Sequence, residues 1–406
     1  MLEKLYKPRN LASLAGHYGA AGAIVAGTLF IAQPWAWAVA AVLVGGLSYA
    51  SIRSQKKFLE NNLVEYPKAS DISPKLGEIA ADLYKKSGLK AEGNPIYDFQ
   101  PDKDKIKKNK LSVSDRLAKM QGLVAQTHNA AALQLGKPVI MISKPLLKLL
   151  DDNEEKAVLA HEFAHAASRH QHATLPQRLI LGVAASAAGL TLIGAMVSLG
   201  WAPVLCAIGA SVVSGIAFRK AIGAERKELL SKEDDDLTLP ELARKKKLVT
   251  GRKLLGTVTT TAVLGFFSPA FLALYGVVKG IGATSKVLSA SFSRSIEYQA
   301  DRGAVTLGAD PLALVTGLRK IEIVAKRSKE KAFDGNLPKA GYLKKIWNSL
   351  TVDHPSTSRR IDRLCKMAKK QGVSQDLIEK AAKSPIEIPA ENDIPYEVIK
   401  SLACRV

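Results

Sequence analysis

The sequence predicts a mainly α-helical protein that combines multi-span membrane helices with a small domain of mixed α+β structure. Long uncharged apolar runs are typical of membrane spans, and such runs occupy residues 14–31, 35–52, 179–218 and 254–283. Between and after them the composition is that of a soluble protein, with helical periodicity and one short β-branched segment. Lysine and arginine crowd the flanks of the apolar runs, as expected for cytoplasmic flanks.

Residues 1–55 are expected to form an N-terminal transmembrane hairpin. One apolar run extends from Leu14 to Ile31 and a second from Trp35 to Ile52, with a polar and proline break at Gln33-Pro34 between them. Because the second run follows at once and no small-residue cleavage site is evident, we do not expect a cleavable signal.

Residues 56–178 have the composition of the first part of the soluble domain. An amphipathic stretch from Pro74 to Lys90 predicts a helix. Residues 137–143 are short, β-branched and bounded by glycine and proline, which predicts a buried or half-buried strand. Residues 151–165 then carry capping residues, early acids and apolar residues at helical spacing, so we expect a helix there.

The middle of the chain is expected to return to the membrane. Residues 179–218 can form a second transmembrane hairpin, whereas the basic segment 219–253 belongs in the cytoplasm. If the chain crossed the membrane an odd number of times after His165, the two halves of the soluble domain would lie on opposite sides of the membrane. Residues 254–284 therefore either bend back at Ser268-Pro269 and return to the same side, or lie in the membrane interface. Residues 285–406 are mostly helical in pattern and form the second part of the domain, with a proline-rich tail from Pro385.

The charge and cysteine content narrow the class of protein. A net charge of +21 suits either nucleic acid or the anionic face of a membrane. No nucleic-acid motif with the expected spacing is present, and the cations lie beside the apolar runs, so nucleic acid is not an expected partner. The three cysteines are too few and scattered for a disulfide framework, which agrees with a reducing compartment.

His161, Glu162 and His165 form an H-E-x-x-H pattern on the helix predicted over residues 151–165. Histidines at i and i+4 project from one helix face and can bind one metal ion, while the intervening glutamate can act as a general base. Imidazole ligands in this arrangement favour zinc, without excluding manganese, iron or cobalt. We therefore expect one zinc ion per chain, with Glu162 as the base.

Catalytic zinc normally has three protein ligands, and a glutamate on a second helix is one way to complete two histidines. The best candidate is Glu297, because Asp301 falls one helical turn later and can orient a ligand histidine through its other ring nitrogen. His170 and His172 are weaker candidates, since they lie too near His165 along the chain to complete a tetrahedral site easily.

Three motifs together resemble the HtpX and CAAX-prenyl-protease group of integral membrane zinc metalloproteases. They are H-E-F-A-H at residues 161–165, E-Y-Q-A-D at 297–301 after Ser293-Arg294, and D-H-P-S-T-S-R-R-I at 353–361. The similarity covers roughly residues 129–364, and the N-terminal hairpin is closest to HtpX in topology. The long insertion between His165 and Glu297 departs from the compact HtpX pattern.

The resemblance implies a small zincin domain of the gluzincin type, with Glu297 as third ligand and Asp301 as its companion. His354 and Arg360 match the later motif of the group, where such residues support the site or the oxyanion in catalysis. Helix capping and surface contacts after a proline turn remain an equal alternative for both. The resemblance also implies that the strand before the zinc helix holds the substrate backbone by edge pairing, which gives the substrate-binding candidates Asn129, Ala130, Val139, Ile140, Met141 and Ile142.

The implied function is a zinc-dependent membrane endopeptidase acting on membrane or misfolded polypeptides in protein quality control. Its expected place is the lipid bilayer of the bacterial inner membrane, with the active site facing the cytoplasm. Two alternatives stay open: a selective CAAX-type processing peptidase, and a catalytically silent membrane scaffold or chaperone with a structural zinc. A structural site needs no general base, so Glu162 argues against the scaffold.

Overall fold

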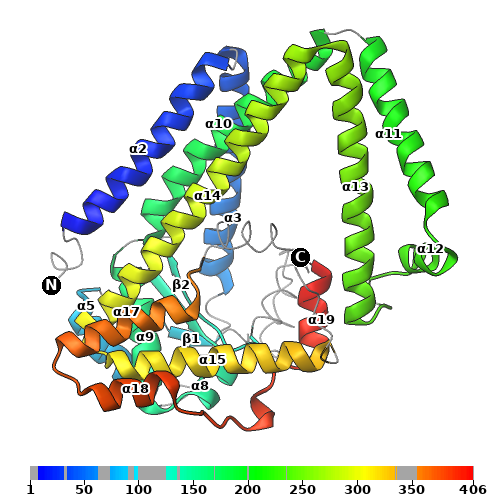
Figure 1. Ribbon diagram of the computed structural model, residues 1–406. Helices are drawn as coiled ribbons and strands as arrows, with labels where there is room; N and C mark the ends of the chain where they lie inside the picture. The colour runs from blue at the N-terminus through cyan, green and yellow to red at the C-terminus, as the bar shows by residue number, and fades with distance from the viewer. Residues whose placement is uncertain are drawn as a thin grey trace.

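A computed structural model shows a mainly helical protein with one small sheet (Figure 1). The structure describes residues 8–31, 34–62, 74–89, 96–98, 125–134, 138–168, 170–198, 201–234, 236–333, 335 and 354–405. The elements before the metal-binding motif are α2 (Pro8–Ile31), α3 (Pro34–Asn62), α5 (Pro74–Ser87), β1 (Ile96–Asp98), β2 (Ala130–Gln134), β3 (Pro138–Ile142) and α8 (Lys144–Leu149). The remaining elements are α9 (Asp152–Ala167), α10 (His170–Ser198), α11 (Trp201–Ala221), α12 (Ala224–Ser231), α13 (Leu239–Phe267), α14 (Pro269–Thr306), α15 (Pro311–Ala332), α17 (Thr357–Lys370), α18 (Gln375–Lys383), η2 (Ala390–Asn392) and α19 (Tyr396–Arg405).

The helices divide into two regions (Figure 1). The long helices α2, α3, α10, α11 and α13 fill the upper part of the view, and the sheet with its shorter helices lies below. Helix α14 starts at the top and enters the lower region, so one continuous helix connects the two regions.

The N-terminal cap of α9 explains why the helix begins where the sequence predicts. The Asp151 side chain accepts hydrogen bonds from the backbone N–H groups of Asn153 and Glu154. The Glu154 carboxylate in turn accepts from the Asp151 N–H at 2.9 Å, which completes a capping box. Glu154 is buried and pairs with Lys320 of α15 at 2.6 Å, so the cap also ties α9 to a neighbouring helix.

Helix α9 is the centre of the main hydrophobic core. Phe163 is completely buried, and its ring meets the edge of the Tyr84 ring of α5 with centroids 4.7 Å apart. The same core contains Ile140 and Ile142 of β3, Ala300 of α14 and residues of α15. Because most residues of α9 are buried in this core, the packing around the helix determines the direction of its polar side chains.

The sheet has the strand order β1-β3-β2, with β1 parallel and β2 antiparallel to β3. The predicted strand is confirmed, but the prediction that it offers a free edge is wrong. Both edges of β3 are occupied by neighbouring strands, and Val139, Ile140, Met141 and Ile142 are buried. A substrate therefore has no access to the backbone of these four residues.

The outer strands β1 and β2 each have one neighbour among the described strands, so each has a free edge, and it is β2 that lines the cleft described below. The Ser143 N–H donates to the Asn129 carbonyl at 3.0 Å, so Asn129 and Ser143 form a hydrogen-bonded pair at the end of the antiparallel strands β2 and β3. In antiparallel strands alternate residues bond to the partner. Ala131 therefore faces β3, while the N–H and C=O groups of Ala130 and Ala132 point away from it.

The upper helices break where the apolar runs break in the sequence. Helices α2 and α3 lie on either side of residues 32–33, and α10 and α11 on either side of residues 199–200. Helix α13 ends at Phe267 and α14 begins at Pro269, and the chain reverses direction at this point (Figure 1). The membrane topology and domain boundaries assigned to these segments stay predictions.

By length and apolarity, no single helix within the described residues would cross a bilayer on its own. One pair of helical segments, Leu205–Ala221 and Ala224–Ser231, meets the requirement together but is bent by 119°. Pro34–Ala50 and Leu179–Ala195 are apolar but shorter.

The charged segment 219–253 contains α12 and the first half of α13. Leu237, Leu239 and Leu242 at the start of α13 are buried together with Phe333 after α15. The Leu239 N–H donates to the Tyr396 hydroxyl of α19 at 3.2 Å. Part of this segment is thus packed against the C-terminal region, and its cytoplasmic location stays a prediction.

Candidate metal centre

His161 and His165 lie one turn apart on α9 and direct their rings to the same side. Their Nε2 atoms are 3.1 Å apart, and the ring planes are nearly perpendicular. His161 is 6% exposed and His165 is half-buried. The i,i+4 spacing on one regular helix is sufficient to bring the two nitrogens together.

Glu297 of α14 completes the group of three. Its Oε2 lies 3.5 Å from His161 Nε2, and its Oε1 lies 3.7 Å from His165 Nε2. Ligands held tetrahedrally at about 2.0–2.1 Å from zinc are about 3.3 Å from one another. The two ring nitrogens and the two carboxylate oxygens lie at separations close to this value, so these residues fit zinc. Among the described residues no other group of this kind occurs.

Glu297 is suited to bind a cation because its carboxyl group is held in the charged form. Burial opposes the charge, but hydrogen bonds from His161 and His354 outweigh it, so the pKa of Glu297 lies well below its ordinary range. A carboxylate that is ionised at all ordinary pH values is available as a ligand.

Glu162 lies beside this group, on the next residue of α9, and is 9% exposed. Burial raises the pKa of its carboxyl group above the ordinary value, while His161 and a hydrogen bond from the Ala132 backbone N–H oppose the rise. A carboxylate with a raised pKa is better able to accept and return a proton near neutral pH. The Ala132 contact also shows that the free edge of β2 faces this carboxylate.

Asp301 and Arg360 form a second layer behind the ligands. Asp301 is 1% exposed and its Oδ1 lies 3.0 Å from His161 Nδ1. With Nε2 reserved for the metal, the Nδ1–H of the neutral ring donates to Asp301, which fixes the ring orientation. Arg360 of α17 donates to both oxygens of Asp301, at 3.0 and 2.6 Å, and its Nη1 lies 3.4 Å from Glu297 Oε2.

His354 is the outermost member of the cluster. Its Nδ1 lies 3.1 Å from Glu297 Oε1, and its side chain is 72% exposed. Both His354 and Arg360 thus contact residues of the metal centre, namely the ligand Glu297 and, for Arg360, also Asp301. The part that they take in catalysis stays a prediction.

A cleft of about 590 Å³ opens in front of the ligands. Its walls carry Asn129 and Ala130, two of the residues proposed from the sequence to bind substrate, whereas Val139 to Ile142 are absent from it. Apolar side chains form most of the remaining wall: Leu146, Val158, Ile296, Leu314, Leu318 and Ile321. The side chains of His170 and His172 lie outside the described residues.

His128 and Ala132 are cleft residues that sequence reasoning did not find. Both ring nitrogens of His128 are buried and have no hydrogen-bond partner among the residues that the structure describes, and burial lowers the pKa of the ring. A lone histidine before an alanine-rich strand carries no recognisable spacing. Ala132 acts through its backbone, so only strand pairing can identify it.

Two histidines one turn apart, an adjacent glutamate and a ligand glutamate on a second helix define a zinc centre of the gluzincin type. The chain belongs to peptidase family M48, whose family model matches residues 105–221 and 246–368. A His-His-Glu cluster of this kind is typical of zinc binding in that family.

Three similar proteins are each described as a protease HtpX homolog. The one from Methanopyrus kandleri is 25% identical over 243 residues, which cover 57% of this chain and 54% of that protein. The one from Aquifex aeolicus is 25% identical over 246 residues, covering 58% and 61%. The one from Polynucleobacter necessarius is 34% identical over 93 residues, covering 21% and 32%. The chain thus spans less than two thirds of each relative, and no solved structure matches it.

Proposed function

We propose that this protein is a membrane-associated zinc endopeptidase that cleaves membrane or unfolded polypeptides, as in protein quality control. The observation that carries the proposal is the position of Glu162, which lies between the His161, His165 and Glu297 ligand set and the free edge of β2. This arrangement brings a base, a metal site and a peptide-binding edge together in one cleft.

The free edge of β2 is proposed to hold the substrate. The outward N–H and C=O groups of Ala130 and the outward C=O of Ala132 can pair with an extended peptide. Such pairing contacts only the backbone of the peptide, so it accepts many sequences. The apolar side chains that line the cleft, including Leu146 and Leu318, favour an apolar residue next to the cleaved bond.

Zinc, when bound by the three ligands, supplies a Lewis acid that polarises the peptide carbonyl and makes water easier to deprotonate. Glu162 accepts the proton from the attacking water and then delivers it to the nitrogen of the departing amine. Asp301 and Arg360 act as positioning residues, because they hold His161 and Glu297. Burial of Glu162 keeps bulk water from competing for its proton.

The upper helices support the proposed membrane association. The large hydrophobic side chains that are exposed lie on α3, α10, α11, α13 and α14, with only Leu377 and Tyr396 elsewhere among the described residues. Exposed apolar surface of this extent marks an interaction with lipid or protein. We propose that lipid covers it and that the metal centre faces the cytoplasm, in agreement with the basic flanks of the apolar runs.

The test is cleavage of an unfolded model protein by the detergent-purified chain, with bound zinc measured in parallel. Glu162→Gln should retain about one zinc per chain and lose about 10³-fold or more of the activity, because general-base catalysis is removed while the ligands remain. Glu155→Gln, a neutralisation at the start of the same helix, is the matched control and should retain both. If zinc-loaded wild type and Glu162→Gln cleave equally, the scaffold alternative replaces the peptidase.

A further inference from the structure

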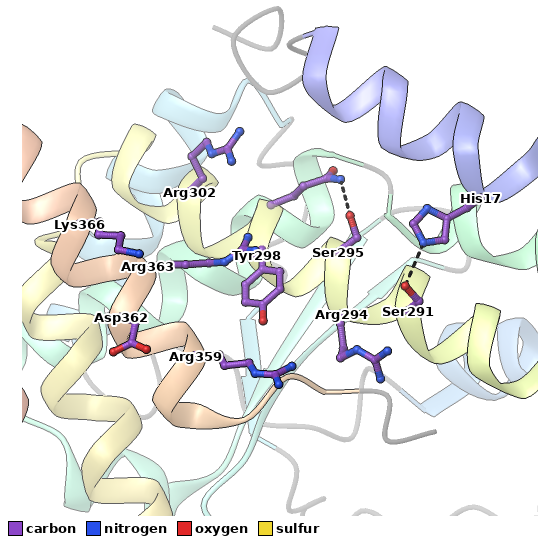
Figure 2. A pocket seen from close by; sticks show the side chains of 11 residues that line it. His17, Ser291, Arg294, Ser295, Tyr298, Arg302, Arg359, Asp362, Arg363 and Lys366 are labelled. Carbon is purple, nitrogen blue, oxygen red and sulfur yellow. Dashed lines mark hydrogen bonds between the residues drawn. The ribbon is translucent and has the colours of Figure 1, made fainter. Parts of the chain in front are cut away.

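A second cavity of about 630 Å³ lies against faces of α14 and α17 that do not carry the metal-site residues (Figure 2). Three helices contribute its lining: His17 from α2; Ser291, Arg294, Ser295, Tyr298, Gln299 and Arg302 from α14; and Arg359, Asp362, Arg363 and Lys366 from α17. On α14 these residues recur at three- and four-residue spacing and therefore share one side of the helix. Glu297 and Asp301 point away from this side to the metal centre.

The cavity is strongly basic. Five of its side chains are cations and Asp362 is its one carboxylate. Within the part of the chain that the structure describes, Arg302, Arg359, Arg363 and Lys366 form no ion pair. Cations gathered without counter-charges repel one another and concentrate anions. The cavity therefore favours a negatively charged ligand.

The arrangement of the side chains suits a phosphate group in particular. The Arg363 guanidinium lies over the Tyr298 ring, 3.6 Å from its centroid (Figure 2). Stacking orients the guanidinium plane, and its N–H groups can then bind two oxygens of a phosphate at once. Ser291 and Ser295, whose hydroxyl groups contact His17 and Gln299, lie along the same wall.

An apolar helix forms the remaining wall of the cavity. His17 of α2 lies with its Nε2 3.3 Å from the Ser291 hydroxyl, and its ring packs against Phe292. Beyond Arg9, α2 carries no charged residue. An anionic group in the cavity therefore lies beside a helix whose exposed residues after His17 are alanine and glycine, which offer an attached acyl chain an apolar surface.

We propose that this cavity binds the phosphate group of an anionic phospholipid, an inference that rests on the membrane association proposed above and not on the peptidase activity. The phosphate is held between the cations of α14 and α17, and the acyl chains lie along α2. Because α14 carries Glu297 and Asp301 while α17 carries Arg360, a headgroup that joins the two helices also stabilises the metal centre on their other faces.

The experiment uses the zinc-loaded full chain with Glu162→Gln, in nonionic detergent, so that binding is measured without hydrolysis. Short-chain phosphatidylglycerol, short-chain phosphatidylcholine and inorganic phosphate are titrated separately by calorimetry. We expect saturable binding of phosphatidylglycerol alone. Arg302→Gln with Arg359→Gln should weaken it about tenfold or more, because two charge-assisted hydrogen bonds are lost.

Lys369→Gln with Lys380→Gln removes the same charge outside the cavity and should change the affinity by about twofold or less. If the first pair of substitutions unfolds the protein, as checked by thermal melting, Arg363→Gln with Lys366→Gln replaces it. Absent binding of phosphatidylglycerol, equal binding of phosphatidylcholine, or equal loss in the cavity and control variants overturns the proposal. Cavity-dependent binding of inorganic phosphate with the same affinity overturns the lipid as the source of the phosphate.

Discussion

Arg360 forms a two-pronged ion pair with Asp301, although 59 residues separate them in the sequence. Its Nε and Nη2 atoms donate to the two carboxylate oxygens, and Asp301 in turn contacts the Nδ1 of His161. The positions of α9, α14 and α17 are therefore coupled through three side chains. A change in any one of these side chains should therefore disturb the metal centre.

Replacing Asp301 with asparagine should weaken zinc binding. Asparagine keeps the shape of the side chain but loses the charge that orients and polarises His161. Substitutions of this type cost about 10- to 100-fold in metal affinity. Competition with a fluorescent chelator measures the change, and Asp376→Asn on α18 is a control that should bind zinc as wild type does. Unchanged affinity in Asp301→Asn would exclude the orienting role.

Arg360→Lys should retain the fold but lower kcat/KM by about 10-fold or more, because an ammonium group cannot bridge both oxygens of Asp301 and also reach Glu297. Arg360→Ala should in addition destabilise the protein by about 3–5 kcal/mol, since it leaves the buried Asp301 carboxylate without its partner. Lys369→Ala, an exposed position on the same helix outside the basic cavity, is the control. Equal activity in Arg360→Lys and wild type would contradict a positioning role.

Prolines in β2 distinguish the free edge from the paired edge. Ala132→Pro removes an outward N–H that contacts Glu162, and an edge position tolerates proline. We expect a folded protein with activity lowered about 10-fold or more, because the hydrogen bond from the Ala132 N–H to the Glu162 carboxylate is lost. Ala131→Pro removes an N–H that faces β3 and should lower the melting temperature instead. The assignment of the edge fails if the two variants behave in the reverse way.

Glu154→Ala should lower the free energy of unfolding by about 2–4 kcal/mol. The substitution removes half of the capping box of α9 and leaves Lys320 without its buried partner. Asp152→Ala removes only an exposed pair with Lys75 and should cost less than about 1 kcal/mol. Thermal melting of both variants in detergent measures the difference, and equal melting temperatures would refute the role of the cap.

Asp393 should make stability depend on pH at the acidic end. Burial opposes its charge, but hydrogen bonds from Lys331 and Arg327 hold the pKa of Asp393 below its ordinary value. A carboxyl group whose pKa is depressed by folding stabilises the protein above its unfolded pKa, and this contribution disappears as the pH falls through the folded pKa. Asp393→Asn should therefore lower the melting temperature at pH 7 and make no difference well below pH 4. A constant difference at both pH values would contradict this assignment.

Local spacing in the sequence determined the helix α9, its cap and the placement of His161, Glu162 and His165 within it. These features depend on residues within one or two turns, so a short segment contains all the information. Glu297 and Asp301 were predicted because one turn separates a ligand from its companion. Their contacts with His161 nevertheless required α14 to pack on α9.

Only the tertiary structure decided which strand presents its free edge to the cleft and where the basic cavity lies. The alanine-rich β2 has little intrinsic strand preference, and it forms because β3 offers it a partner. The parallel pairing of β1 with β3 then occupies the other edge, which no local pattern in either strand encodes. The cavity arises because α14 and α17, far apart in the sequence, place their basic faces side by side. Local chemistry was thus determined by the sequence alone, whereas relations between distant segments depended on how the core packs.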